Sequence, residues 1–108
     1  MDRVYISGPM TGLPNYNFDE FNRVAELLRF EGYNVVNPAD HGVIPGWEWK
    51  DYLKLDIKDM LGCNIVATLE GWQESRGARL EVHIAEQLHM KVVPFEQLLK
   101  NQEDKNEL

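Results

Sequence analysis

Two carboxylates occupy helix positions where the surrounding pattern calls for apolar side chains. The spacing of apolar residues predicts a helix over 76–89, and the same three- and four-residue spacing places Glu81 on its apolar face. That face is otherwise formed by Ala78, Val82, Ala85 and Leu88. Asp56 lies in the same way on the apolar face of a helix predicted over 48–61. Because a buried ionised carboxylate is costly unless it is paired, each needs a structural partner, such as a backbone group or an arginine, or a chemical purpose.

The segment before Glu81 has the composition of an anion site. Ser75 stands at the expected N-cap and Gly77 in the first turn, where small residues let a ligand approach closely. The free N–H groups and the dipole of a helix N-terminus attract negative charge, and the Ser75 hydroxyl adds a donor. Phosphate is the natural occupant of such a site. A plain capped helix without a ligand is the alternative interpretation.

The elements that must position these residues alternate along the chain. The sequence predicts strands over 3–7, 34–37, 64–69 and 91–94, and helices over 18–31, 48–61 and 76–89. This alternation predicts an α/β fold, a single flavodoxin-like or Rossmann-like domain over 1–100 with a parallel sheet of about four strands and helices on both faces. The polar segment 101–108 is expected to be a disordered tail.

Any ligand site of such a fold should lie beyond the carboxyl ends of the strands. The loops at that edge are predicted at 8–17, 38–47 and 70–77. A straight helix from residue 48 would carry Asp56 about two turns from this edge, so we expect a break or a late start near Asp51. At the first helix, Asn17 followed by Glu20 predicts a capping box.

Three motifs within this pattern carry a family resemblance. They are Tyr5-Ile-Ser-Gly-Pro-Met-Thr-Gly12, the Tyr52-to-Asp56 spacing before Cys-Asn-Ile-Val, and Ser75-Arg-Gly-Ala-Arg-Leu-Glu81. Over about residues 3–94 the chain resembles the nucleoside 2-deoxyribosyltransferase superfamily. It is most similar to the short deoxyribosyltransferase-like proteins of phages and bacteria, and next to the deoxynucleoside 5′-monophosphate N-glycosidases.

The resemblance implies a role for each matching residue. Glu81 would be the nucleophile that attacks C1′ of a deoxyribosyl group, Tyr5 would orient its carboxylate, and Asp56 would help to protonate the departing base. The substrate-binding residues expected on the same grounds are Gly8, Pro9, Met10, Thr11, Gly12, Asn37, Ser75 and Gly77. Such a carboxylate can stabilise or bond to an oxocarbenium-like centre, and either water or a second base can then resolve the intermediate. Hydrolysis and transfer both remain open.

Position 75 bears on the substrate class. The transferases of the superfamily tend to carry an aspartate there and the monophosphate N-glycosidases a serine, so Ser75 favours a nucleotide, because a hydroxyl does not repel phosphate. Two departures from the superfamily stand against the match: Asn64 replaces a usual aspartate, and the predicted sheet has four strands instead of five. Hydrolysis of NAD or another N-riboside, and a nucleotide sensor without catalysis, are the alternative functions.

Composition narrows the classes of partner. The chain carries 18 Asp and Glu against 11 Lys and Arg, for a net charge of −7, without the basic cluster of a duplex-DNA binder. No apolar run reaches the roughly 18 residues of a membrane-spanning helix. The lone Cys63 and the absence of a leader favour a cytoplasmic location.

Cofactor, metal and subunit expectations complete the sequence analysis. The loop 8–12 is neither a P-loop nor a dinucleotide fingerprint, so no cofactor is expected. No metal is expected either, because metal-ligand spacing is missing among His41, His83, His89 and Cys63. Stacking on a base and packing in a core or interface are both open for Trp47, Trp49 and Trp72. A homodimer or larger homo-oligomer is expected, because 108 residues leave little protein to cover both faces of the sheet.

Overall fold

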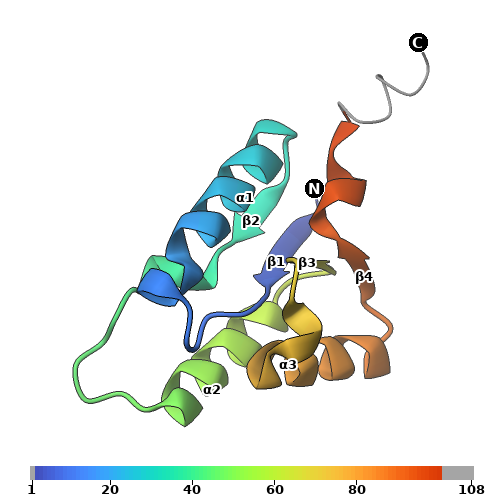
Figure 1. Cartoon of the computed structure of the whole chain (residues 1–108). Helices are drawn as coiled ribbons and strands as arrows, with labels where there is room; N and C mark the ends of the chain where they lie inside the picture. The colour runs from blue at the N-terminus through green and yellow to red at the C-terminus, as the bar shows by residue number, and fades with distance from the viewer. Residues whose placement is uncertain (1, 101–108) are drawn as a thin grey trace.

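The computed structural model describes residues 2–100 and consists of a four-stranded parallel sheet with helices on both faces (Figure 1). The strands are β1 (Arg3–Ser7), β2 (Asn34–Val36), β3 (Ile65–Thr68) and β4 (Lys91–Pro94). Their spatial order is β2-β1-β3-β4, and every neighbouring pair is parallel. The predicted α/β fold with four parallel strands is confirmed, and its strand order is that of a flavodoxin-like domain.

Three helices cover the two faces of the sheet unequally. They are α1 (Phe18–Phe30), α2 (Trp49–Met60) and α3 (Arg76–Gln87). On one face, α1 buries Phe21 and Leu28 against Ile6 of β1. On the other face, Met60 of α2 and Ala85 of α3 cluster with strand residues that include Tyr5 and Val66. Figure 1 accordingly shows α2 and α3 together and α1 apart from them.

Four 3₁₀ helices follow the carboxyl ends of strands or occupy their connections. They are η1 (Pro14–Asn17), η2 (Pro38–His41), η3 (Trp72–Glu74) and η4 (Phe95–Leu98). Of these, η1, η2 and η3 fall inside the loops that the sequence predicts at the ligand edge of the sheet, whereas η4 adds Phe95 and Leu98 to the core on the α1 face. None of the helices among residues 2–100 has the length and apolar character needed to cross a membrane.

Two local expectations are wrong. The helix α2 runs from Trp49 to Met60 without a break. It starts early because Glu48, its N-cap, and Asp51 form a reciprocal capping box. At α1, Asn17 is the N-cap but makes no capping hydrogen bond, since its backbone is left-handed (φ 62°) and its amide donates to the Pro9 carbonyl (3.0 Å). The expected tail, 101–108, lies outside the described residues.

Candidate active site

Glu81 is held by two hydroxyl groups from the central strand of the sheet. Tyr5 Oη donates to Glu81 Oε2 and Ser7 Oγ donates to Glu81 Oε1, each at 2.7 Å. Alternate residues of a strand point to the same face, so both side chains of β1 reach the buried face of α3. All three side chains are buried, with Glu81 5% exposed. No lysine, arginine or histidine among the described residues forms an ion pair with this carboxylate.

Ser7 is the site residue that sequence reasoning missed. It is 1% exposed and supplies half of the hydrogen bonds to Glu81. A signal for it was present, since Ser7 stands two residues after Tyr5 in the same strand and must therefore share its face. A polar residue at the buried end of a strand, next to a tyrosine expected at the site, needs a polar partner of its own.

The surroundings of Glu81 move the titration of its carboxyl group towards neutral pH. Burial raises the pKa of the Glu81 carboxyl from 4.5 to about 7, although the hydrogen bonds from Ser7 and Tyr5 act in the opposite direction. Burial and the nearby charge of Glu81 raise the pKa of Tyr5 well above its ordinary value. Tyr5 therefore keeps its proton and remains a donor to the carboxylate.

Asp56 is a second, partly buried acid of the site. It lies on α2, and its side chain is 16% exposed. Burial, together with the charges of Glu81 and Asp59, raises its pKa from 3.8 to about 8. Within residues 2–100, no hydroxyl group donates to Asp56 as Tyr5 and Ser7 donate to Glu81. The pair therefore loses its first proton preferentially from Glu81, which leaves an ionised Glu81 facing a protonated Asp56.

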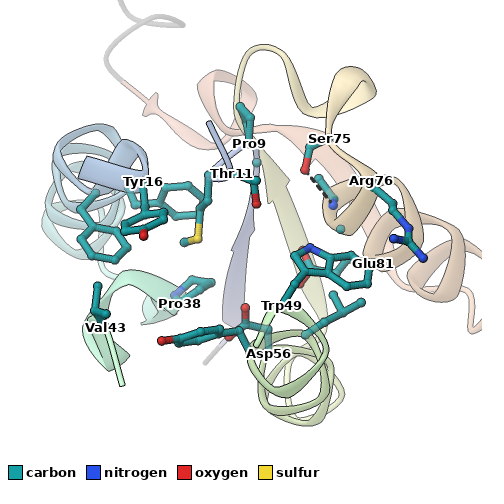
Figure 2. A pocket seen from close by; sticks show the side chains of 18 of the residues that line it. Pro9, Thr11, Tyr16, Pro38, Val43, Trp49, Asp56, Ser75, Arg76 and Glu81 are labelled. Carbon is teal, nitrogen blue, oxygen red and sulfur yellow. Dashed lines mark hydrogen bonds between the residues drawn. The ribbon is translucent and has the colours of Figure 1, made fainter. Parts of the chain in front are cut away.

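Both acids line one cavity of about 880 Å³ at the carboxyl edge of the sheet. Figure 2 shows them on α3 and α2, with the loop after β1 above and the start of α3 at the side. The sequence-predicted site residues that line this cavity are Tyr5, Gly8, Pro9, Met10, Thr11, Asp56, Ser75, Gly77 and Glu81. Asp56 reaches the cavity from an unbroken α2, so no helix break is needed to bring it there.

Two predicted substrate-binding residues lie outside the cavity lining. The Asn37 side chain accepts from the Ala39 N–H (3.0 Å) and donates to Asn22 Oδ1 (2.9 Å), so it caps η2 and ties it to α1. Its amide is used within the fold. Gly12 has a positive φ of 85° in the turn before η1, which is a backbone conformation that favours glycine.

The two remaining glycines of interest differ in what they allow. A Cβ at Gly8 would lie 2.7 Å from the Cβ of Leu69, so only glycine lets the backbone after β1 pass this close to the residue that follows β3. A Cβ at Gly77 would meet Leu53 and Trp49 only at ordinary contact distances of 3.7 Å or more. Gly8 is therefore required by the fold, whereas Gly77 leaves space on the cavity side of α3.

The N-terminus of α3 has the cap that the sequence predicts. Ser75 Oγ accepts from the Ala78 N–H at 3.2 Å. Arg76 follows it, and its guanidinium lies over the indole of Trp49, 4.3 Å from the ring centroid (Figure 2). Arg76 is the only lysine, arginine or histidine in the described lining of the cavity.

Aromatic side chains form the wall of the cavity near α2. Trp47 and Trp49 line it, whereas Trp72 does not. The Tyr52 ring contacts Trp47 edge-on, with 5.2 Å between centroids. The Tyr52 hydroxyl accepts from the Ile44 N–H (2.7 Å) and donates to the Ile44 carbonyl (3.1 Å), which fixes the loop between η2 and α2.

The histidines and the cysteine hold no metal cluster. Within residues 2–100, no group of three or more His, Cys, Asp and Glu side chains is arranged to hold a metal ion. His41 contacts Asp59 at 3.0 Å and lies 4.0 Å from Asp56. Cys63 is buried, which raises the pKa of its thiol, and its Sγ donates to the Asp59 carbonyl at 3.6 Å.

Comparison with known sequences identifies a family without assigning an activity. The profile of the family described as "Domain of unknown function (DUF4406)" matches residues 2–94. This stretch contains all four strands, all three α-helices and every residue of the cavity described above. No protein of curated function matches the chain.

Proposed function

The chain belongs to this DUF4406 family, and we propose that it cleaves or exchanges the N-glycosidic bond of a 2′-deoxynucleotide or deoxynucleoside, with Glu81 as the nucleophile. The observation that carries the proposal is the buried Glu81 carboxylate, oriented by two hydroxyl donors and facing a second acid across a cavity of about 880 Å³. The motif resemblance to the nucleoside 2-deoxyribosyltransferase superfamily supports the same chemistry.

The proposed reaction has two steps, formation of a glycosyl ester on Glu81 and its resolution. The Glu81 carboxylate attacks C1′ while the electron pair of the C1′–N bond leaves with the base, which takes its proton from Asp56. The intermediate is a glycosyl ester on Glu81. Water or a second base then attacks C1′ and releases Glu81, and the Asp56 carboxylate takes the proton that the attacking group loses.

The fold supports each role physically. Burial removes water from the Glu81 carboxylate, and the hydroxyls of Tyr5 and Ser7 fix both of its oxygens in direction. Burial together with the Glu81 charge favours the protonated form of Asp56, which is the form that a leaving base requires. Once the pair has lost one proton, the nucleophile is thus ionised while Asp56 is protonated.

The cavity wall suggests where the substrate's parts lie. Trp47 and Trp49 offer apolar faces on which a base can stack. The capped start of α3 offers N–H groups, the Ser75 hydroxyl and the Arg76 guanidinium, which favour an anionic 5′ group. We therefore expect nucleoside 5′-monophosphates to be preferred over nucleosides.

Release of free base tests the proposal directly. The protein is incubated with each deoxynucleoside 5′-monophosphate, the matching nucleosides and NAD, and products are separated by chromatography, with and without an added acceptor base. We expect free base or an exchanged nucleotide from the deoxynucleotides. Nicotinamide release from NAD alone would instead support an N-riboside hydrolase. A ligand that raises the melting temperature without any turnover would support a nucleotide sensor and contradict the proposal.

A homodimer or larger homo-oligomer is part of the same proposal. Several large apolar side chains at the cavity mouth are at least 38% exposed in the single chain, namely Tyr16, Val43, Trp47 and Trp49. A second subunit would cover them and narrow the opening. Light scattering at micromolar concentration measures the mass, and a value near 12.5 kDa with full activity on dilution would contradict this part.

A further inference from the structure

His41 and Asp59 lie near Asp56 but do not line the cavity. His41 ends η2, and Asp59 lies on α2 three residues after Asp56, which places both aspartates on one side of the helix. His41 Nε2 lies 3.0 Å from Asp59 Oδ2 and 4.0 Å from Asp56 Oδ1. Of these three residues only Asp56 lines the cavity, so His41 and Asp59 would not touch a substrate bound there.

The two distances from His41 correspond to different interactions with Asp59 and with Asp56. At 3.0 Å, His41 Nε2 and Asp59 Oδ2 are within hydrogen-bond distance of each other. At 4.0 Å, the same nitrogen makes no hydrogen bond to Asp56 and interacts with it only through charge. His41 therefore fixes the position of the Asp59 carboxylate, which lies one helical turn from Asp56.

The charged and titratable groups around this cluster are mostly acidic. They are Asp59 on the same helix, Glu81 and Tyr5 at the cavity floor, His41 and its neighbour Asp40 on η2, Arg29 paired with Asp40 at 3.6 Å, and Cys63 against the Asp59 carbonyl. Arg29 is the only permanent cation in this set, and it is directed at Asp40. Burial opposes ionisation of Asp56 most strongly, and the negative charges of Glu81 and then Asp59 act in the same direction.

We propose that His41 and Asp59 form a positioning pair for Asp56, in which His41 holds the Asp59 carboxylate in place and Asp59 adds a negative charge beside Asp56. The functional meaning of the pair rests on the proposed role of Asp56 as the acid that protonates the leaving base. The upper pH limit of activity then depends in part on two residues that do not line the cavity.

A titration of the Asp56 carboxyl tests the pair without requiring turnover. Carbon-13 labelling of aspartate carboxyls gives a titration curve for each group by NMR, and the Asp56 signal is assigned by its loss in Asp56→Asn. The variant Asp59→Asn keeps an acceptor for His41 but removes the charge. Glu86→Gln is the matched control, because it removes one negative charge from an exposed position outside the cavity.

We expect the Asp56 titration midpoint to fall by roughly one pH unit in Asp59→Asn and by less than about 0.2 units in Glu86→Gln. An unchanged midpoint in Asp59→Asn would overturn the proposal. If the wild-type protein releases base, the basic limb of its kcat/KM profile should move to lower pH with the midpoint. A midpoint that falls in a protein without turnover would support the pair and contradict the proposed function.

The role of His41 is tested by two substitutions of different kind. His41→Ala removes the donor that holds Asp59, and we expect kcat to fall about tenfold with little change in KM. His41→Gln keeps a donor and should restore most of that loss. Equal losses at every pH in both variants, with the Asp56 titration unaltered in each, would mean that His41 serves the fold alone and would overturn its part of the proposal.

Discussion

The two faces of the sheet are built from the same strands but differ in what they bury. The face covered by α1 and η4, called the α1 face here, carries the larger apolar cluster and buries no acid among the described residues. The face covered by α2 and α3, the α2–α3 face, has a smaller apolar cluster and buries Glu81. One strand serves both, because β1 sends Val4 and Ile6 to the first face and Tyr5 and Ser7 to the second. The alternation of side chains along β1 thus separates the larger apolar cluster from the hydroxyl groups that bind Glu81.

The largest effect expected on the α2–α3 face is the loss of turnover in Glu81→Gln. The substitution removes the nucleophile's charge at nearly constant shape, so we expect the rate to fall by more than about 100-fold while the protein stays folded. Base release is measured by chromatography and folding by circular dichroism. Retention of more than a few per cent of the wild-type rate would remove Glu81 from this role and weaken the contrast between the faces.

The matched change on the α1 face is Leu28→Ala. Leu28 is fully buried in the apolar cluster, and its truncation should lower the free energy of unfolding by about 2–5 kcal/mol. Denaturant unfolding measures this loss, and kcat at a temperature where the variant is folded should stay close to that of the wild type. A large drop in kcat for the folded variant would show that the α1 face also shapes the site.

Stability should depend on pH through the α2–α3 face. The pKa of Glu81 is raised in the folded protein from 4.5 to about 7, so protonation favours the fold. The stability gained in this way is fully present below about pH 4.5 and is lost as the pH rises towards about 7. This difference in pKa corresponds to a change in the free energy of unfolding on the order of 3 kcal/mol. Glu81→Gln carries no such charge, so its stability relative to the wild type should increase from pH 4.5 to pH 8.

Denaturant midpoints across this pH range check the sign and the size of the effect. Leu28→Ala is the control, since its loss of stability should stay constant as the pH changes. A parallel course of the Glu81→Gln and wild-type curves would mean that the carboxyl is not destabilised by burial.

Tyr5→Phe should have an intermediate effect on turnover. It deletes one of two hydrogen bonds to Glu81 without emptying the core position, so we expect a loss on the order of 10- to 100-fold, equivalent to about 1–3 kcal/mol. Ser7→Ala is the matched variant, because it deletes the bond to the other oxygen. Rates unchanged in both would show that the hydroxyls serve packing only.

The smallest effect is expected at the edge of the cavity, in Ser75→Asp. A carboxylate at this N-cap still caps α3 but adds negative charge where a 5′-phosphate would lie. The ratio of kcat/KM for monophosphates to that for nucleosides should therefore fall several-fold. The same ratio in Ser75→Asn, which caps without charge, is the control. A ratio unaffected by the charge would place the 5′ group elsewhere.

The sequence allowed the main elements and the two acids to be predicted because their signals are local. Glu81 and Asp56 stand out on apolar helix faces, and each of the seven predicted elements is bounded by proline, glycine or a capping residue. Ser7 and Asn37 show the limit of such reasoning. Both are buried polar residues at strand ends, and only the tertiary contacts decide that Ser7 binds Glu81 while Asn37 binds Asn22 and caps η2.

The expected break in α2 was wrong for a related reason. The prediction assumes that the ligand site lies beyond the end of the helix, so that the distance from Asp56 to the site runs along the helix axis. In the fold the cavity extends along the side of α2, where Trp49, Tyr52, Leu53 and Asp56 all line it. The helix thus forms a wall of the cavity over most of its length. How an element is placed against a site depends on contacts between distant parts of the chain, which hydrophobic periodicity does not contain.

The alternation of β1 also constrains how this protein can evolve. An insertion or deletion of one residue within Val4–Ser7 would exchange the two sets of side chains. The hydroxyl groups would then point into the apolar cluster of the α1 face, and the aliphatic groups would point towards Glu81. Such a change removes the core and the chemistry in a single event. The loop 42–48, in contrast, lies at the surface and carries part of the cavity wall, so new substrates can be accommodated there by changes in length and composition. Diversity should therefore accumulate at the mouth of the pocket, while the strand beneath it stays fixed in length.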